Sequence, residues 1–138
     1  GYLITETDTV VIDLGTATTF DVVSKNKEYL GGSIAPGIKI SLDALTLKTA
    51  SLKSVELDIP NKVIGKNTYE AIQSGLIMGH ASMIDSMVEK IILEIDIEPK
   101  IILTGGLSKV VQPILNVNVE YIENLTLVGL EEIFKLNN

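Results

Sequence analysis

The stretch VVIDLGTATTFD, residues 10–21, decides the fold of this chain. It begins with apolar, β-branched residues, which are typical of a buried strand, and that run ends on the carboxylate of Asp13. A glycine and three threonines follow, and a second apolar run starts at Phe20. The pattern predicts two antiparallel strands, Thr9–Leu14 and Thr19–Ser24, joined by a tight turn rich in small polar groups.

This turn carries groups that can contact phosphate. Gly15 lets the backbone approach a ligand closely, and the hydroxyls and N–H groups of Thr16, Thr18 and Thr19 can donate to phosphate oxygens. Asp13, at a strand end, can hold a cation or orient a water. A β-hairpin with a threonine-rich turn and no ligand fits the same residues, so both interpretations stay open at this point.

The rest of the chain alternates between apolar segments of strand and helix spacing. We expect, in chain order, a strand over Glu28–Ile34, a helix over Ile38–Leu47, a short strand or extended run over Val55–Ile59, a long helix from about Tyr69 to Glu94 capped by Asn67 or Thr68, a strand over Ile101–Thr104, a helix over Leu107–Leu115, a short strand over Val117–Ile122 and a last helix over Leu125–Leu136. A three-strand meander followed by strand–helix pairs predicts an α/β domain of the ribonuclease H-like kind, in the actin-like ATPase and sugar kinase superfamily. Its mixed five-stranded sheet is flanked by helices, and Ile101–Thr104 lies parallel to the first strand.

A second strand-to-glycine turn, Thr104–Ser108, is expected at the same sheet edge as Asp13–Thr19. Ligands of α/β sheets lie beyond the carboxyl ends of the strands, and this turn opens a helix whose N-terminal amides favour anions. A glycine turn between a strand and a helix is also common without a ligand. Only the two turns together favour a nucleotide lying across the edge.

Composition excludes several classes of protein. The 138 residues suit one domain, and 46% hydrophobic residues indicate a folded core. A net charge of −7 argues against a nucleic-acid-binding surface, and the absence of cysteine excludes disulfides and thiolate sites. No apolar run reaches the ~18 residues that a bilayer span requires. We therefore expect a cytoplasmic protein with no membrane and no nucleic-acid partner.

Five sequence blocks, in the right order, resemble the type III pantothenate kinase family. They are IDLGTATTFD (residues 12–21), LGGSIAPGI (30–38), IGKNT (64–68) with QSG (73–75), TGGL (104–107) and LTLVGL (125–130). The resemblance implies ATP-dependent phosphorylation of pantothenate to 4′-phosphopantothenate, the first step of coenzyme A biosynthesis. It also implies Mg²⁺, a monovalent cation (K⁺ or NH₄⁺), and a homodimer formed through the long helix 69–94, which carries a glycine pair at Gly75 and Gly79.

The resemblance carries over to individual positions. It implies Asp13 as the metal ligand for the monovalent cation, Thr68 as a substrate-binding residue for pantothenate, and a set of ATP-binding residues: Gly15, Thr16, Thr18, Gly105 and Gly106. The remaining polar and sulfur-bearing candidates are expected to have structural roles. His80, the only histidine, is open to a role as general acid or base, but packing or a place at an interface is favoured. Met78, Met83 and Met87 are expected to pack in the core or at an interface, and Asp43 and Asp85 to lie on solvated helix faces.

The resemblance covers only the C-terminal half of the family's pattern. Family members also carry an N-terminal half with an Asp-x-Gly-Asn-Thr phosphate loop and a Gly-x-Asp-Arg segment that supplies the proposed base, and neither occurs in this sequence. We therefore expect residues 1–138 to be a single half-domain of a two-domain kinase, without catalytic residues of its own and inactive alone. The alternative is a non-catalytic half-domain that binds a nucleotide or a partner chain, as a regulator or as a subunit of a split enzyme.

Overall fold

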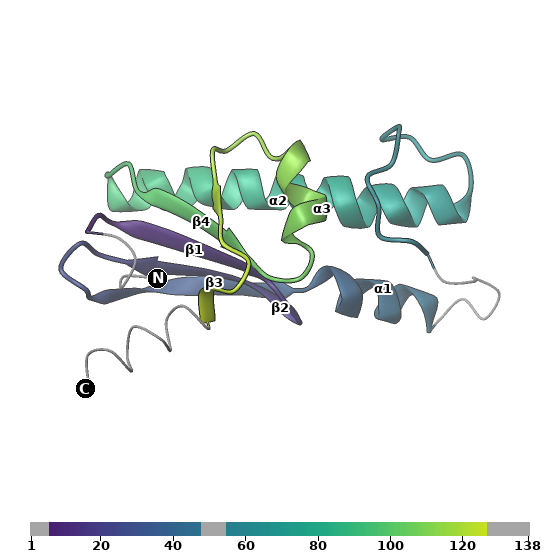
Figure 1. The fold of residues 1–138 in the computed structure, drawn as a ribbon. Helices are drawn as coiled ribbons and strands as arrows, with labels where there is room; N and C mark the ends of the chain where they lie inside the picture. The colour runs from purple at the N-terminus through teal and green to yellow at the C-terminus, as the bar shows by residue number, and fades with distance from the viewer. Residues whose placement is uncertain (1–5, 48–54, 127–138) are drawn as a thin grey trace.

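The structure is a computed structural model that describes residues 6–47 and 55–126. In chain order its elements are β1 (Thr9–Leu14), β2 (Ala17–Val23), β3 (Tyr29–Pro36), α1 (Ile38–Thr46), α2 (Thr68–Ile95), β4 (Lys100–Thr104), α3 (Ser108–Val111), a 3-10 turn over Gln112–Ile114 and β5 (Glu120–Tyr121). The strands form one sheet in the order β3-β2-β1-β4-β5. α2 covers one face of this sheet, and α1 continues outward from the end of β3 (Figure 1).

The sheet is mixed, as the sequence predicts. β1 pairs antiparallel with β2, and β2 with β3, whereas β4 runs parallel to β1 with Asp13 opposite Thr104. This confirms the three-strand meander, the parallel fourth strand and the ribonuclease H-like fold class. Because β1 and β4 are parallel and in register, their carboxyl ends are neighbours, and so are the turns that follow them.

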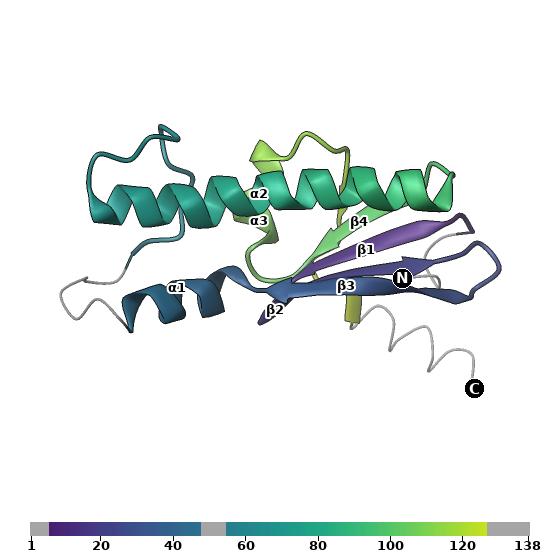
Figure 2. The ribbon, with the colours of Figure 1, turned by 180° about the vertical axis from the view of Figure 1, so that it is seen from behind.

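The core lies between the sheet and α2. Alternate strand residues point toward the helix, so that Ile12 and Phe20, which are opposite each other in the ladder, are both almost fully buried. Ile77, Ile84 and Val88 of α2 are fully buried against them. Burial of these side chains contributes most of the stability of this layer. Seen from behind, α2 extends past the sheet and runs beside α1, which it contacts (Figure 2).

The start of α2 is fixed by local hydrogen bonds. Asn67 is the N-cap, and its side-chain oxygen accepts a bond from the backbone N–H of Glu70 at 2.9 Å. The Glu70 carboxylate in turn accepts from the backbone N–H of Lys66 at 2.8 Å. The first bond satisfies one of the N–H groups that a helix start leaves free, and the second holds the residue before the cap. Within residues 6–47 and 55–126, neither this helix nor any other has the apolar length that a membrane span needs.

Two expected elements differ from the sequence prediction. The helix expected over Leu107–Leu115 is split into α3 and a 3-10 turn at Pro113, which has no N–H to donate. Of the two alternatives for residues 55–59, the structure does not contain the short strand. The strand expected over Val117–Ile122 shrinks to Glu120–Tyr121, because only Ile102 and Leu103 of β4 pair with it. Most of the helix expected over Leu125–Leu136 lies outside the described residues.

Asp85 is buried, which corrects its expected place on a solvated helix face. It is 7% exposed and accepts four hydrogen bonds from two residues that follow the 3-10 turn. The backbone N–H of Asn116 donates to both carboxylate oxygens at 3.0 Å, the Asn116 amide donates at 2.9 Å and the N–H of Val117 donates at 3.1 Å. This carboxylate therefore ties α2 to the segment that leads into β5.

We expect Asp85→Ala to lower the free energy of unfolding by about 2 kcal/mol, because it leaves the part-buried N–H donors of Asn116 and Val117 without their acceptor. Urea denaturation followed by circular dichroism measures this difference. Asp43→Ala is the matched control, since Asp43 is exposed on α1, as expected, and its removal should change stability little. A loss below about 1 kcal/mol for Asp85→Ala would contradict the anchoring role, because such a loss is ordinary for a surface position.

Candidate functional site

The two glycine turns pack against each other at the carboxyl ends of β1 and β4. Gly105 has a positive φ of 102°, and a Cβ built on it would lie 2.6 Å from the backbone N and C of Leu14 and from Oδ1 of Asp13. A side chain at Gly105 is therefore excluded both by conformation and by space. The expected placement of the two turns on one sheet edge is confirmed.

The turn between β1 and β2 consists of Gly15 and Thr16 and is held from two sides. Within the turn, the N–H of Gly15 donates to the carbonyl of Ala17 at 3.2 Å. Against it lies Gly37, the N-cap of α1, where an added Cβ would run into the carbonyl oxygens of Gly15 and Thr16. Three backbone segments thus converge here, namely the hairpin turn, the start of α1 and the turn after β4.

These three segments enclose a pocket of about 380 Å³. Its lining residues are Leu14, Gly15 and Thr16 from the hairpin, Lys39, Ile40 and Asp43 from α1, and Gly106 and Leu107 from the turn after β4. The pocket therefore brings together three of the five residues expected to bind ATP. Gly105 supports it from behind, through its contact with Leu14.

Lys39 is a pocket residue that sequence reasoning missed. It lies in the first turn of α1, and among the described residues it has no ion-pair partner. An ammonium group in the wall of a pocket favours an anion such as phosphate, and the Asp43 carboxylate in the same wall offsets part of this positive charge. A lone lysine in an amphipathic helix carries no signal in the sequence, so only the fold shows that it faces this pocket.

Thr18, also expected to contact ATP, is separated from Thr16 by the alternation of β2. It is 1% exposed, and its hydroxyl lies 2.7 Å from Nε2 of His80 on α2. Thr18 is opposite Leu14 in the ladder and shares the face of Phe20, which the helix covers. Its hydroxyl is thus part of an internal hydrogen bond, and Thr18 does not line the pocket.

Asp13 lies on the other face of the sheet from Thr18, since neighbouring strand residues alternate. Burial raises the pKa of Asp13, and the nearby Asp21 carboxylate raises it further. Asp21 is itself oriented by hydrogen bonds from the Tyr29 hydroxyl at 3.0 Å and the Thr19 hydroxyl at 3.3 Å. A cation would relieve the repulsion between the two carboxylates, so the donor chemistry at Asp13 fits a hard cation that takes oxygen ligands. In the part of the chain that the structure describes, no three acidic or histidine side chains gather into a metal site.

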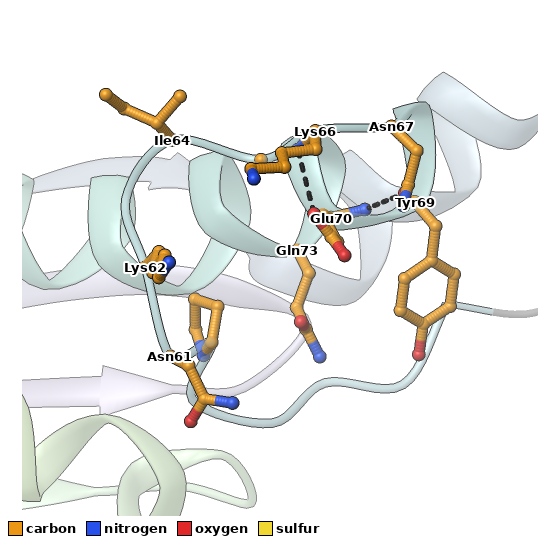
Figure 3. A pocket seen from close by; sticks show the side chains of 10 residues that line it. Asn61, Lys62, Ile64, Lys66, Asn67, Tyr69, Glu70 and Gln73 are labelled. Carbon is orange, nitrogen blue, oxygen red and sulfur yellow. Dashed lines mark hydrogen bonds between the residues drawn. The ribbon is translucent and has the colours of Figure 1, made fainter.

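Thr68 lies in a different hollow from the glycine turns. It is the first residue of α2 and lines a pocket of about 680 Å³ with Leu45 of α1, residues 65–67 and the first turns of α2. A second pocket of about 680 Å³ lies beside this one and shares residues 65–67 with it. Figure 3 shows the second pocket, with Lys62, Lys66 and Gln73 around it and Glu70 reaching toward Lys66. Neither pocket shares a lining residue with that of the glycine turns, although α1 contributes to two of the three.

The sequence profile of the type III pantothenate kinase family matches residues 2–90. This chain belongs to that family. The matched range of this pantothenate kinase family member includes Asp13, Gly15, Thr16, Thr18 and Thr68 and ends before the Gly105 turn.

Curated relatives named type III pantothenate kinase match nearly the whole chain. One from Anaeromyxobacter sp. (strain K) is 45% identical over 128 residues, which cover 93% of this chain and 50% of the relative. One from Syntrophus aciditrophicus (strain SB) is 46% identical over 132 residues, which cover 95% of this chain and 52% of the relative. This family member therefore spans about half the length of the curated relatives it matches.

A solved structure from Campylobacter jejuni has a similar fold. It is described as a conserved putative Baf family transcriptional activator, and it aligns with a TM-score of 0.60 and 28% sequence identity. The alignment covers 94% of this chain and 58% of that one. The structural alignment, like the sequence alignments, therefore covers only part of the related chain.

We expect Gly105→Ala to destabilise this pantothenate kinase family member by at least about 2 kcal/mol, because the methyl group clashes with Leu14 and Asp13 at a positive φ. Gly106→Ala is the matched control one residue away, where an added Cβ meets nothing within 4 Å. Thermal and urea unfolding of both variants measure the difference. Equal stability of the two variants would show that the contact between the turns tolerates a side chain.

Proposed function

We propose that this chain is one half of a type III pantothenate kinase, an enzyme that transfers the γ-phosphoryl group of ATP to the terminal hydroxyl of pantothenate and forms 4′-phosphopantothenate. One observation carries the proposal: Gly15, Thr16 and Gly106 line one pocket where β1 and β4 end, in a chain that belongs to this family. The carboxyl ends of the strands are where α/β sheets bind nucleotides. The product would enter coenzyme A biosynthesis, and the proposed location is the cytoplasm.

The proposed roles follow from the chemistry of each group. Thr16 and the turn N–H groups contact phosphate oxygens, Gly105 and Gly106 leave the backbone open to the adenosine, and the Lys39 ammonium balances phosphate charge. Asp13 holds a monovalent cation, K⁺ or NH₄⁺, on the face of the sheet that α2 does not cover. Mg²⁺, when bound with ATP, neutralises charge on the phosphates, as in phosphoryl transfer generally.

Thr68 is proposed to bind pantothenate away from the nucleotide pocket. Thr68 is exposed at the first position of α2, in a hollow that shares residues 65–67 with the pocket of Figure 3. Because no described residue joins Thr68 to the glycine turns in one pocket, a complete site needs a second polypeptide segment between them. That segment is proposed to come from an N-terminal half, from a second copy of the chain, or from both.

The catalytic base is proposed to lie in an N-terminal half of the enzyme, outside residues 1–138. We expect this chain alone to show no pantothenate-dependent ADP release, because loss of an essential charged group in phosphoryl transfer costs on the order of 10³-fold or more. Adding the N-terminal half, in cis or in trans, should restore turnover that depends on ATP and on K⁺. A coupled ADP-release assay with and without pantothenate measures both results, and Asp13→Asn should then weaken the rate and the K⁺ dependence together.

Robust turnover by the 138-residue chain alone would show that the base lies within it. Pantothenate phosphorylation absent from the complemented enzyme would refute the proposed function itself. The reading frame upstream of Gly1 gives an independent check, because a kinase half should be preceded by Asp-x-Gly-Asn-Thr and Gly-x-Asp-Arg.

A homodimer through the outer face of α2 is part of the proposal. This face carries a stripe of small exposed residues, Ala71, Gly75, Gly79, Ser82 and Ser86. A Cβ added to Gly75 or Gly79 meets nothing within 4 Å, so the chain's own fold does not require glycine at either position. Glycine in a helix interior costs about 1 kcal/mol relative to alanine, and close approach by a second helix explains why it is present.

We expect Gly79→Leu to abolish dimerisation, since a leucine would hold the two helices apart, while the isolated chain stays folded. Sedimentation velocity at micromolar concentration measures the state of association, and circular dichroism measures the fold. Glu28→Leu, in the exposed turn between β2 and β3, adds the same side chain elsewhere and should leave the dimer intact. A wild-type monomer under these conditions would contradict the proposed dimer, since stable dimers of this kind bury roughly 2,000 Å² or more.

The alternative function is that of a regulator without catalysis. The description of the Campylobacter neighbour as a transcriptional activator and the half-length match favour it. The net charge of −7 argues against direct contact with nucleic acid, so such a regulator would act by binding a nucleotide or a protein. Nucleotide binding without turnover, even with the N-terminal half present, would favour this alternative.

A further inference from the structure

One polar contact crosses the apolar layer beneath the candidate nucleotide pocket. Nε2 of His80, on the inner side of α2, lies 2.7 Å from the Thr18 hydroxyl at the start of β2. Thr18 is 1% exposed, so water cannot replace this partner, and an unpaired hydroxyl there would cost stability. The contact is therefore a directional link beside a cluster of apolar side chains whose packing is non-directional.

The link acts on the residue that closes the hairpin turn. Thr18 is opposite Leu14 in the ladder, and only Gly15, Thr16 and Ala17 lie between them. Gly15 and Thr16 line the pocket, and the Gly15 N–H donates to the Ala17 carbonyl within the turn. A bond that fixes Thr18 consequently restricts the short segment whose backbone faces the ligand.

The chemistry of the pair suits a permanent bond. Burial lowers the pKa of the His80 imidazole, so the ring is neutral at neutral pH, with one nitrogen that donates and one that accepts. A neutral ring and a hydroxyl can pair with either partner as donor. The bond therefore needs no ion and no ligand to form, and it is present before a nucleotide arrives.

We propose that His80 is a positioning residue, which holds the Gly15–Thr16 turn through the Thr18 hydroxyl and thereby sets the affinity of the pocket for ATP. The ATP part rests on the proposed function, whereas the effect on the turn does not. His80 lines neither the pocket of the glycine turns nor the two pockets at the start of α2, so it acts through Thr18 alone.

The test measures the effect on the turn and the effect on ATP binding separately. Amide hydrogen exchange at Gly15, measured by NMR in the 138-residue chain, reports on the turn, and ATP affinity is measured by titration in the same chain. His80→Phe and Thr18→Val each remove the bond, His80→Gln offers a side-chain nitrogen at the position of Nε2, and Thr18→Ser keeps the hydroxyl. Ser24→Ala is the matched control, because the Ser24 hydroxyl accepts a hydrogen bond from the Glu28 N–H at 3.2 Å in the exposed turn between β2 and β3.

We expect His80→Phe and Thr18→Val each to speed exchange at Gly15 and to weaken ATP binding by roughly five- to tenfold, the effect of one lost buried hydrogen bond. The double variant should be no worse than either single variant, because both remove the same bond. His80→Gln and Thr18→Ser should restore most of both readouts, and Ser24→Ala should change neither. If His80 had only a structural role, His80→Phe would lower the melting temperature but would not raise the exchange rate at Gly15 relative to the rest of the sheet.

The outcomes distinguish the two claims. The positioning role would be overturned if the exchange rate at Gly15 were unchanged in folded His80→Phe and in Thr18→Val, or if the effects of the two substitutions were additive. This holds whatever affinity for ATP is measured. If the bond controls the turn but the wild-type chain binds no ATP, the proposed nucleotide function of this pocket fails while His80 keeps its place as the residue that holds the turn. Should His80→Phe fail to fold, the nearly isosteric Thr18→Val gives the same comparison.

Discussion

The close contact between Gly105 and the end of β1 is the constraint on which the rest of this structure depends. Parallel pairing of β1 with β4 brings two chain turns to the same place, and the backbones can only coexist there if one of them has no side chain. Once this contact forms, the hairpin turn, the start of α1 and the turn after β4 enclose one pocket. The glycines and the pocket are therefore consequences of one packing arrangement.

Most of the sheet and α2 could be predicted from the sequence, because they depend on local pattern. The β-branched run ending at Asp13 and the long helical spacing after Asn67 are signals within one segment. β5 and Asp85 could not be predicted in the same way. β5 exists only where β4 offers it two residues to pair with, and Asp85 resembles any charged residue of a surface helix until Asn116 and Val117 are placed beside it.

The candidate site shows the same division between local and long-range information. Gly15, Thr16 and Gly106 were predicted from motifs in single turns, and they do line one pocket. Thr18 belongs to the same motif but lies on the face of Phe20, and the alternation along a strand, which is visible in the sequence, separates it from Thr16. Lys39 and the partner of His80 depend on how α1 and α2 pack, so no pattern within a segment reveals them.

Polar links of α2 such as those of Asp85 and His80 explain how a pocket can form at a fixed place beside an apolar layer. Contacts such as those of Ile77 and Ile84 with the sheet stabilise the layer but direct it weakly, since apolar surfaces can shift against each other at little cost. Hydrogen bonds require particular distances and angles, so the Asp85 and His80 links fix both the axial position and the rotation of the helix. Because the helix is rigid, its first residue Thr68 is then held at a set place relative to the hairpin turn, although the two lie in different pockets. The geometry between the proposed substrate and nucleotide positions is thus determined by polar groups that touch neither ligand.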